Sequence, residues 1–231
     1  VNVYKIRVAK KHFYNRFLNE IRLKLISMGF KEYKGPIIES SFWNCDALFM
    51  PSFHPSREIH SIFYVKTDKK AEIDSEILEK VRKVHLGLGS NSIGWGSFDE
   101  ELCKKILLRS QTTAVSARVL YLIYKKKEKI PIKMFVIDRV FRPETIDPKH
   151  FIEFDQLEGI IIEENANFKM LLNYLKEIVI YLGAKNVKFK PAYFPFTEPS
   201  VEIFAEISNL GLVEIGGAGI FRREVVEPFG I

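Results

Sequence analysis

Residues 140–159 (VFRPETIDPKHFIEFDQLEG) gather charged, amide and aromatic side chains at short spacing. If the second half of this stretch is a strand, Phe154, Gln156 and Glu158 share one face, because successive side chains of a strand alternate. An arginine such as Arg142 presents a rigid fork to a phosphate, an aromatic ring stacks on a base, and amide and carboxylate groups hold an ammonium. The stretch predicts a ligand platform or, as the simpler interpretation, a solvent-exposed hairpin edge.

Further elements must position these side chains. Apolar residues recurring every four positions predict a first helix that starts at Phe13 and ends near Gly29. The same reasoning predicts helices over residues 74–85, 99–108, 113–124 and 167–182. Strands are expected at residues 37–38, 132–142, 151–164, 186–196, 200–207 and 212–221, with loops at 87–97 and 143–149. Hairpins that follow helices without βαβ alternation predict an α+β fold, an antiparallel sheet backed by helices.

Composition narrows the class of protein. The chain has 231 residues, 47% of them hydrophobic, which is enough to bury a sizeable core. Its net charge of +6 allows an anionic partner such as a nucleotide or nucleic acid, although a lysine-rich solvated surface gives the same value. Cys45 and Cys103 form no CxxC pair and no zinc-ligand spacing, which favours a reducing, cytoplasmic location. The sequence contains no run of about 18 apolar residues, so no membrane span is expected.

The spacing Phe141-Arg142-x-Glu144, a loop, and then His150-x-x-x-Phe154 resembles motif 2 of the class II aminoacyl-tRNA synthetases. Residues 29–58 resemble the motif 1 region and following loop of one family in this class, the phenylalanyl-tRNA synthetase alpha subunits of archaeal and eukaryotic type. Other segments match the same family in order: LLRSQTTAVSAR, FDQLEG, KPAYFPFTEPSVEIF and VEIGGAGIFR. The resemblance covers nearly the whole chain. It implies a single class II synthetase-like domain over residues 1–231, an antiparallel sheet flanked by helices.

The resemblance also implies an activity. In this family the enzyme condenses phenylalanine with ATP to an adenylate and transfers the acyl group to tRNA(Phe), with ATP and Mg²⁺ as cofactors. A beta subunit is the expected partner, in a heterotetramer of two alpha and two beta chains. Pro36 and the helix before it resemble motif 1, which forms a subunit interface in class II enzymes. A plain helix-to-strand turn is the simpler interpretation, and the two are compatible.

The motif match assigns the nucleotide side of the site. It implies that Arg142 stabilises the charge that builds on the α-phosphate during adenylate formation. Glu144 would lie by the adenine or the tRNA terminus, His150 would reach the outer phosphates, and Phe154 would stack on adenine. Glu202 and Glu214 could bind Mg²⁺ together with ATP, although surface carboxylates are the simpler interpretation.

The match also assigns the amino-acid side. It implies that Gln156 and Glu158 hold the α-ammonium of the substrate and that Phe194 and Phe196 pack on its phenyl ring. An ordinary aromatic core pair is the alternative for the two phenylalanines. Gln111 and Thr113 complete the expected substrate-binding residues.

The sequence departs from the family pattern in three places. Gln111 stands where the family has histidine, and an amide can form hydrogen bonds but cannot titrate near neutrality. His60 and Ser61 replace a common Gln and Asp. Motif 3, with its arginine, and the N-terminal tRNA-binding extension are not in the sequence, so a chain ending at Ile231 is expected to be a poor ligase. Two alternatives therefore stay open: a non-catalytic paralogue that binds an amino acid or tRNA, and a sister ligase for phosphoserine or pyrrolysine.

Overall fold

A computed structural model describes residues 9–89, 92–147 and 150–231. The described α-helices are α1 (Phe13–Ser27), α2 (Ser41–Asn44), α3 (Ser75–His85), α4 (Glu100–Cys103), α5 (Thr113–Lys126), α6 (Phe168–Tyr181) and α7 (Arg223–Val226). The short 3-10 helices are η1 (Asp46–Leu48), η2 (Pro55–Arg57) and η3 (Glu227–Phe229). The described strands are β1 (Lys31–Glu32), β2 (Ile38–Ser40), β3 (Ile106–Leu108), β4 (Ile132–Phe141), β5 (Glu153–Ile162), β6 (Asn186–Phe194), β7 (Thr197–Ile207) and β8 (Gly211–Phe221).

The α+β class is confirmed, and the strands form three small sheets in the described residues. Their orders are β1-β4-β5, β2-β3 and β6-β7-β8. All pairs are antiparallel except β1 with β4, which is parallel. Parts of two predicted loops, residues 90–91 and 148–149, lie outside the described residues.

The helix predicted over residues 99–108 is wrong beyond its first turn. Asp99 begins α4, since its side chain accepts a hydrogen bond from the Leu102 backbone at 2.9 Å, but the helix ends at Cys103. The apolar run that follows becomes β3 and pairs with β2. A short apolar run does not distinguish a helix from a buried strand. The buried position of Leu107 beside β2 decides for the strand.

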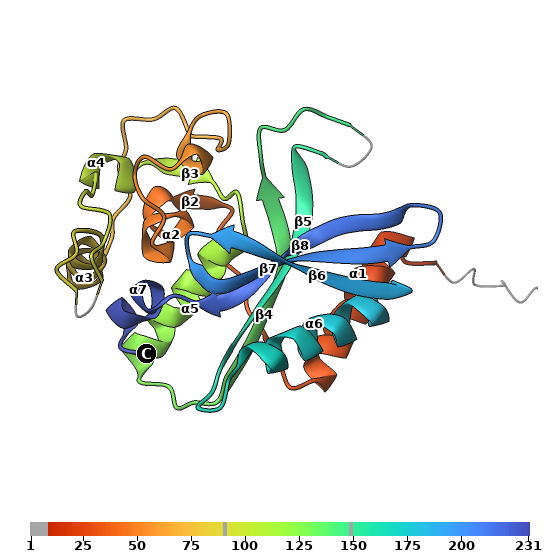
Figure 1. Ribbon diagram of the computed structural model, residues 1–231. Coiled ribbons are helices and arrows are strands. Elements are labelled where there is room, and N and C mark those ends of the chain that lie inside the picture. Colours follow the sequence, from red (N-terminus) through yellow and green to blue (C-terminus); the bar gives the residue numbers. More distant parts are fainter. Residues whose placement is uncertain (1–8, 90–91, 148–149) are drawn as a thin grey trace, which may run out of the picture.

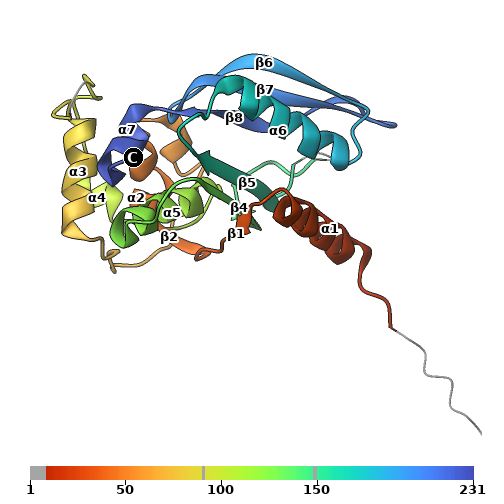
Figure 2. The ribbon, with the colours of Figure 1, turned by 90° about the horizontal axis from the view of Figure 1, so that it is seen from below.

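The β4–β5 hairpin lies at the centre of the molecule (Figure 1) and positions the predicted site. Its back face presents Phe135, Ile137 and Leu157 to an apolar cluster with α1 and α6. Helix α6 contacts the β6–β7–β8 sheet through its other side, where Val179 packs on Ile203. Figure 2 shows α6 lying along that sheet, on the side of β4, β5 and α1. The opposite face of the hairpin is left for α5.

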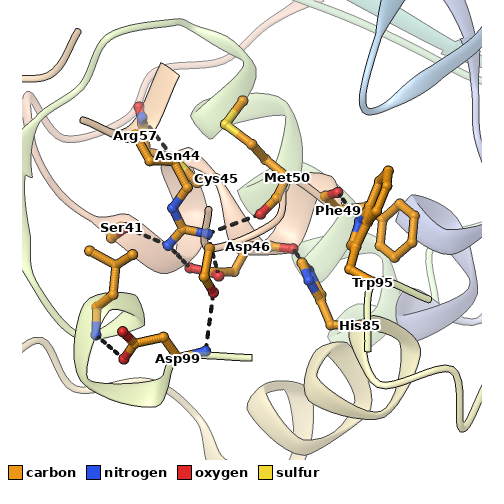
Figure 3. A network of polar contacts seen from close by, with 12 residues as sticks. Ser41, Asn44, Cys45, Asp46, Phe49, Met50, Arg57, His85, Trp95 and Asp99 are labelled. Atoms are coloured by element: carbon orange, nitrogen blue, oxygen red, sulfur yellow. Dashed lines mark hydrogen bonds and ion pairs between the residues drawn. The ribbon is translucent and has the colours of Figure 1, made fainter. Parts of the chain in front are cut away.

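A second core lies where α2, α3, α5 and α7 meet, to one side of the hairpin in Figure 1. Buried polar residues run through this core (Figure 3). The Arg57 guanidinium forms two contacts with the Asp46 carboxylate, at 2.7 and 2.9 Å, and both side chains are almost fully buried. The ring nitrogen Nε2 of His85 lies 2.9 Å from the Asp46 carbonyl oxygen, against Phe49. Uncharged His85 and the charged pair thus share one dry region.

Acid should destabilise the protein through His85. Burial lowers the pKa of this imidazole to about 4 in the folded state. The unfolded chain, with a histidine pKa of about 6.5, therefore binds the proton first, and stability is lost as the pH falls below that value. We expect the free energy of unfolding to fall by about 2 kcal/mol between pH 8 and pH 5 from this group. Urea denaturation of the wild type and of His85→Gln measures it, since other titrating groups cancel in the difference. Equal pH slopes would contradict the assignment.

Candidate functional site

The strand register brings three of the predicted site residues onto one face of the hairpin. Phe154 pairs with Val140, Gln156 with Asp138 and Glu158 with Val136, so the alternation expected from the sequence holds. On this face the backbone N–H of Thr112, just before α5, donates to Oε1 of Gln156 at 3.1 Å. The face that carries Gln156 and Glu158 is therefore turned to the start of α5, and both side chains are partly buried.

Glu158 accepts hydrogen bonds from three hydroxyl groups of the α5 segment. The hydroxyls of Thr113, Ser116 and Thr112 lie 2.5, 2.6 and 3.4 Å from its carboxylate oxygens. Burial raises the pKa of Glu158 above its ordinary value, and the hydroxyl donors oppose that shift. No cation is paired with this carboxylate in the described residues, so it is chemically suited to accept an ammonium group.

Arg142 and Phe154 lie together at the end of the hairpin. Nε of Arg142 donates to the Ser110 carbonyl at 2.9 Å, and its guanidinium carbon lies 5.2 Å from the Phe154 ring centroid. Burial lowers the pKa of Arg142, while the charge of Glu144 opposes the shift. An arginine remains charged despite such a shift. The pair thus presents a fixed cation beside an aromatic face.

The other two motif residues lie in the exposed loop between β4 and β5. The Glu144 backbone N–H donates to the Arg142 carbonyl at 2.8 Å, and the Glu144 side chain is exposed. Nδ1 of His150 lies 2.8 Å from Oδ2 of Asp147. Both residues therefore lie outside the two strands, whereas Phe154 lies within β5.

Phe194 and Phe196 form a stacked pair at the turn between β6 and β7. Their ring centroids are 5.9 Å apart and their planes are inclined by 15°. Phe196 packs against the cluster of Cys45 and Ile62. Gly217 leaves room for the Phe194 ring, because a Cβ there would lie 2.3 Å from Cζ of Phe194. The two rings are therefore partly buried and backed on one side by bare backbone.

Glu202 and Glu214 lie on the neighbouring strands β7 and β8. Glu202 pairs with Gly217 and Glu214 pairs with Phe204, so the two carboxylates are diagonal neighbours by register. Glu202 is partly buried and Glu214 is exposed. Within residues 9–89, 92–147 and 150–231, no three His, Cys, Asp or Glu side chains gather as a metal-binding group. Any Mg²⁺ here would need oxygen ligands from elsewhere.

Residues 109–111 connect the two ends of the site, and of these only Gln111 was predicted from the sequence. Arg109 is fully buried and donates to the carbonyls of Arg139 and Gly35 at 2.7 and 3.0 Å. Ser110 accepts from Arg142, as described above. Nε2 of Gln111 donates to the Asn44 carbonyl at 2.9 Å, so its amide is engaged with backbone. The hydroxyl residues in TTAVS recur at helical spacing and could have indicated the Glu158 contacts. The hydrogen bonds between Ser110 and Asn44 join distant parts of the chain, and no sequence pattern indicates them.

Comparison with known proteins gives consistent matches. The family model described as tRNA synthetases class II core domain (F) matches residues 1–231. A phenylalanine–tRNA ligase alpha subunit of Methanocaldococcus jannaschii is 46% identical over 223 residues, which are 96% of this chain and 45% of the relative. The alpha subunit of Saccharolobus solfataricus is 46% identical over 224 residues, 97% of this chain and 46% of the relative. The alpha subunit of Methanopyrus kandleri is 48% identical over 226 residues, 96% of this chain and 42% of the relative. The chain thus spans less than half the length of these relatives.

Proposed function

Because the chain belongs to the class II tRNA synthetase core family, we propose that it activates phenylalanine with ATP and transfers it to tRNA(Phe), as the catalytic core of a ligase alpha subunit. The observation that carries the proposal is the shared segment of residues 110–113. It contacts Arg142 at one end, and Gln156 and Glu158 at the other. A phosphate-binding cation and an ammonium-binding carboxylate are therefore tied to one piece of backbone, as a reaction between a nucleotide and an amino acid requires.

The amino acid would bind through its two ends. The Glu158 carboxylate and the Gln156 amide would hold the α-ammonium, with Thr113 orienting Glu158 through its 2.5 Å hydrogen bond. Gln111 would stand nearby with its amide bound to Asn44. The phenyl side chain would pack on the rings of Phe194 and Phe196, which offer an apolar, shape-selective surface. An apolar pair of this kind disfavours a phosphorylated side chain.

The nucleotide would bind at the other end of the hairpin. Its adenine would stack on Phe154, and Arg142 would stabilise the negative charge that develops on the α-phosphate as the carboxylate attacks. Glu144 would approach the adenine or the tRNA terminus, and His150 the outer phosphates. Mg²⁺ would be held by Glu202 and Glu214 together with phosphate oxygens, where it would neutralise phosphate charge.

The partners are proposed from the same resemblance. The relatives are named as alpha subunits, which supports a beta subunit as partner, and we propose two alpha and two beta chains acting in the cytoplasm. Within the described residues, no helix has both the length and the apolarity to cross a membrane.

Phenylalanine-dependent ATP–pyrophosphate exchange tests the proposal. The full-length alpha subunit is assembled with its beta partner and assayed with phenylalanine, tyrosine and phosphoserine. We expect exchange that depends on phenylalanine and charging of tRNA(Phe). Assembled protein that binds phenylalanine without exchange would instead identify a non-catalytic paralogue, and preference for another amino acid would identify a sister ligase.

The affinity for phenylalanine should depend on the ionisation of Glu158. Because burial raises its pKa, the carboxylate is protonated at a higher pH than an ordinary glutamate, and the ammonium then loses its partner. We expect KM for phenylalanine to rise as the pH falls through this raised pKa. Glu158→Gln should raise KM by roughly 10- to 100-fold at neutral pH and remove that acid limb, since hydrogen bonds to charged groups contribute about 1.5–3 kcal/mol. A variant that keeps the limb would contradict the role of Glu158.

Gly217→Ala should damage phenylalanine binding selectively. The new Cβ would lie 2.3 Å from Cζ and 2.6 Å from Cε2 of Phe194, so the ring must leave its stacked position beside Phe196. We expect KM for phenylalanine to rise by about 2- to 13-fold, equivalent to the 0.5–1.5 kcal/mol of an aromatic pair, with KM for ATP nearly unchanged. The matched control is Gly216→Ala, whose Cβ meets nothing within 4 Å. Equal effects of the two substitutions would contradict the prediction.

A further inference from the structure

Asn44, the last residue of α2, is fully buried, and its side-chain amide forms hydrogen bonds with both the backbone and the side chain of Ser110. Its Oδ1 accepts from the Ser110 backbone N–H at 3.1 Å, and its Nδ2 donates to the Ser110 hydroxyl at 3.0 Å. The Asn44 carbonyl also accepts from Nε2 of Gln111 at 2.9 Å. One asparagine therefore fixes the backbone and side chain of Ser110 and the side chain of the next residue.

The residue fixed in this way is the one that holds Arg142. Nε of Arg142 donates to the Ser110 carbonyl, so only Ser110 separates the Asn44 amide from the guanidinium. Two residues further on, the Thr112 backbone binds Gln156. A displacement of this segment would move the arginine and the amide together.

Asn44 is itself held in a rigid setting. The residue after next is Asp46, whose carboxylate is paired with Arg57, and Arg57 also donates to the Ser41 hydroxyl at 3.0 Å and to the Met50 carbonyl at 2.9 Å (Figure 3). These contacts tie the start of α2 to the turn that follows it. Asn44 therefore lies between a buried ionic contact and the segment that carries the site.

We propose that Asn44 is a positioning residue, which sets the reactive orientation of Arg142 through Ser110 and takes no direct part in binding substrate. This inference rests on the proposed function for its kinetic consequence, but not for its structural one. Asn44 would thus help to position the phosphate-binding arginine, although Asn44 lies on α2 and Arg142 follows β4.

Kinetics of assembled, full-length enzyme give the first test. Asn44→Ala should lower kcat for phenylalanine activation by about 100-fold, the loss expected from misplacing a catalytic group by about 1 Å, and KM for phenylalanine should rise as well, because the same segment holds Gln156. In a double-mutant cycle, Asn44→Ala should cost little more once Arg142 is already alanine, because both changes remove the same interaction. Additive losses would overturn the proposal. Asn167→Ala, which truncates the asparagine at the N-terminus of α6, is the control and should leave kcat unchanged.

Chemical modification gives a second test that needs no activity. Phenylglyoxal labels arginines, and mass spectrometry of peptides reports the rate at each site. We expect Arg142 to be labelled several-fold faster in Asn44→Ala than in the wild type, with exposed Arg16 labelled equally in both. Ser110→Ala should accelerate the labelling less, and it decides the matter if Asn44→Ala does not fold. Unchanged labelling of Arg142 in the folded variants overturns the proposal. A wild-type enzyme without exchange activity would refute the proposed function alone, since the labelling still tests Asn44.

Discussion

Replacing Arg142 with alanine should lower the rate of phenylalanine activation by about 100- to 1000-fold, the loss that follows removal of one group stabilising transition-state charge. The guanidinium is partly buried, bound to the Ser110 carbonyl and lying beside Phe154. It is therefore oriented before the substrates arrive. Single-turnover adenylate formation by the assembled enzyme measures the loss. Arg142→Lys should recover only part of the rate, because an ammonium keeps the charge without the planar fork.

The control is Arg139, which lies on strand β4, the strand that ends just before Arg142. Arg139 forms ion pairs with Glu153 and Asp155, and its side chain is 40% exposed. The pair with Glu153 is exposed, and such pairs contribute about 0–1 kcal/mol, so Arg139→Ala should fold and retain nearly full activity. If Arg142→Ala stayed within about threefold of the wild type, the transition-state role would be excluded.

Breaking the Asp46–Arg57 pair should have the largest effect on stability. Both side chains are at most 1% exposed, so replacing Arg57 with methionine leaves a buried carboxylate without a counter-charge. Removal of one partner of a buried pair costs about 3–5 kcal/mol, and urea denaturation should show a loss of that size. Burial raises the pKa of Asp46 to about 6, with Arg57 opposing the shift. The measurement belongs near pH 8, where the wild-type carboxylate is ionised in both the folded and the unfolded state; removing Arg57 raises its pKa further.

Two comparisons separate the charge effect from packing. Replacing both residues, Asp46→Leu with Arg57→Met, should recover much of the stability, because two apolar side chains leave no uncompensated charge. Replacing Lys70 with methionine breaks an exposed pair with Glu101 and should cost at most about 1 kcal/mol. A double variant as unstable as the single one would show that packing, not charge, dominates at this site.

The elements with strong periodicity could be predicted from the sequence. The helices α1, α3, α5 and α6 and the long strands β4 to β8 lie close to their expected ranges. The resemblance to a class II synthetase family is confirmed by the family model over residues 1–231. The failures are short elements. One helix was predicted over residues that form α4 and then β3. The sequence could not separate them, because pairing with strand β2 decides the conformation of Ile106–Leu108.

The candidate site also has features that the sequence predicts and features that it does not. Alternation along β5 predicted that Phe154, Gln156 and Glu158 share a face, and the register confirms it. Alternation along the strand expected at residues 186–196 puts Phe194 and Phe196 on one side, and the two rings do lie together. The strand ends at Phe194, however, so a turn brings Phe196 beside it. The contacts of Asn44 join residues far apart in sequence through buried amide geometry, which leaves no pattern along the chain. The roles of the individual site residues stay predictions.

The parallel pairing of β1 with β4 has a consequence for synthesis of the protein. Lys31 and Glu32 pair with Met134 and Phe135, so the first strand waits for about a hundred further residues before its partner exists, and such distant contacts form slowly. Until then Phe30, which packs against Phe135 in the finished protein, stays uncovered on the ribosome. A nascent chain stalled before residue 132 should therefore recruit chaperones more strongly than one that extends beyond α6, which completes the cluster around Phe30.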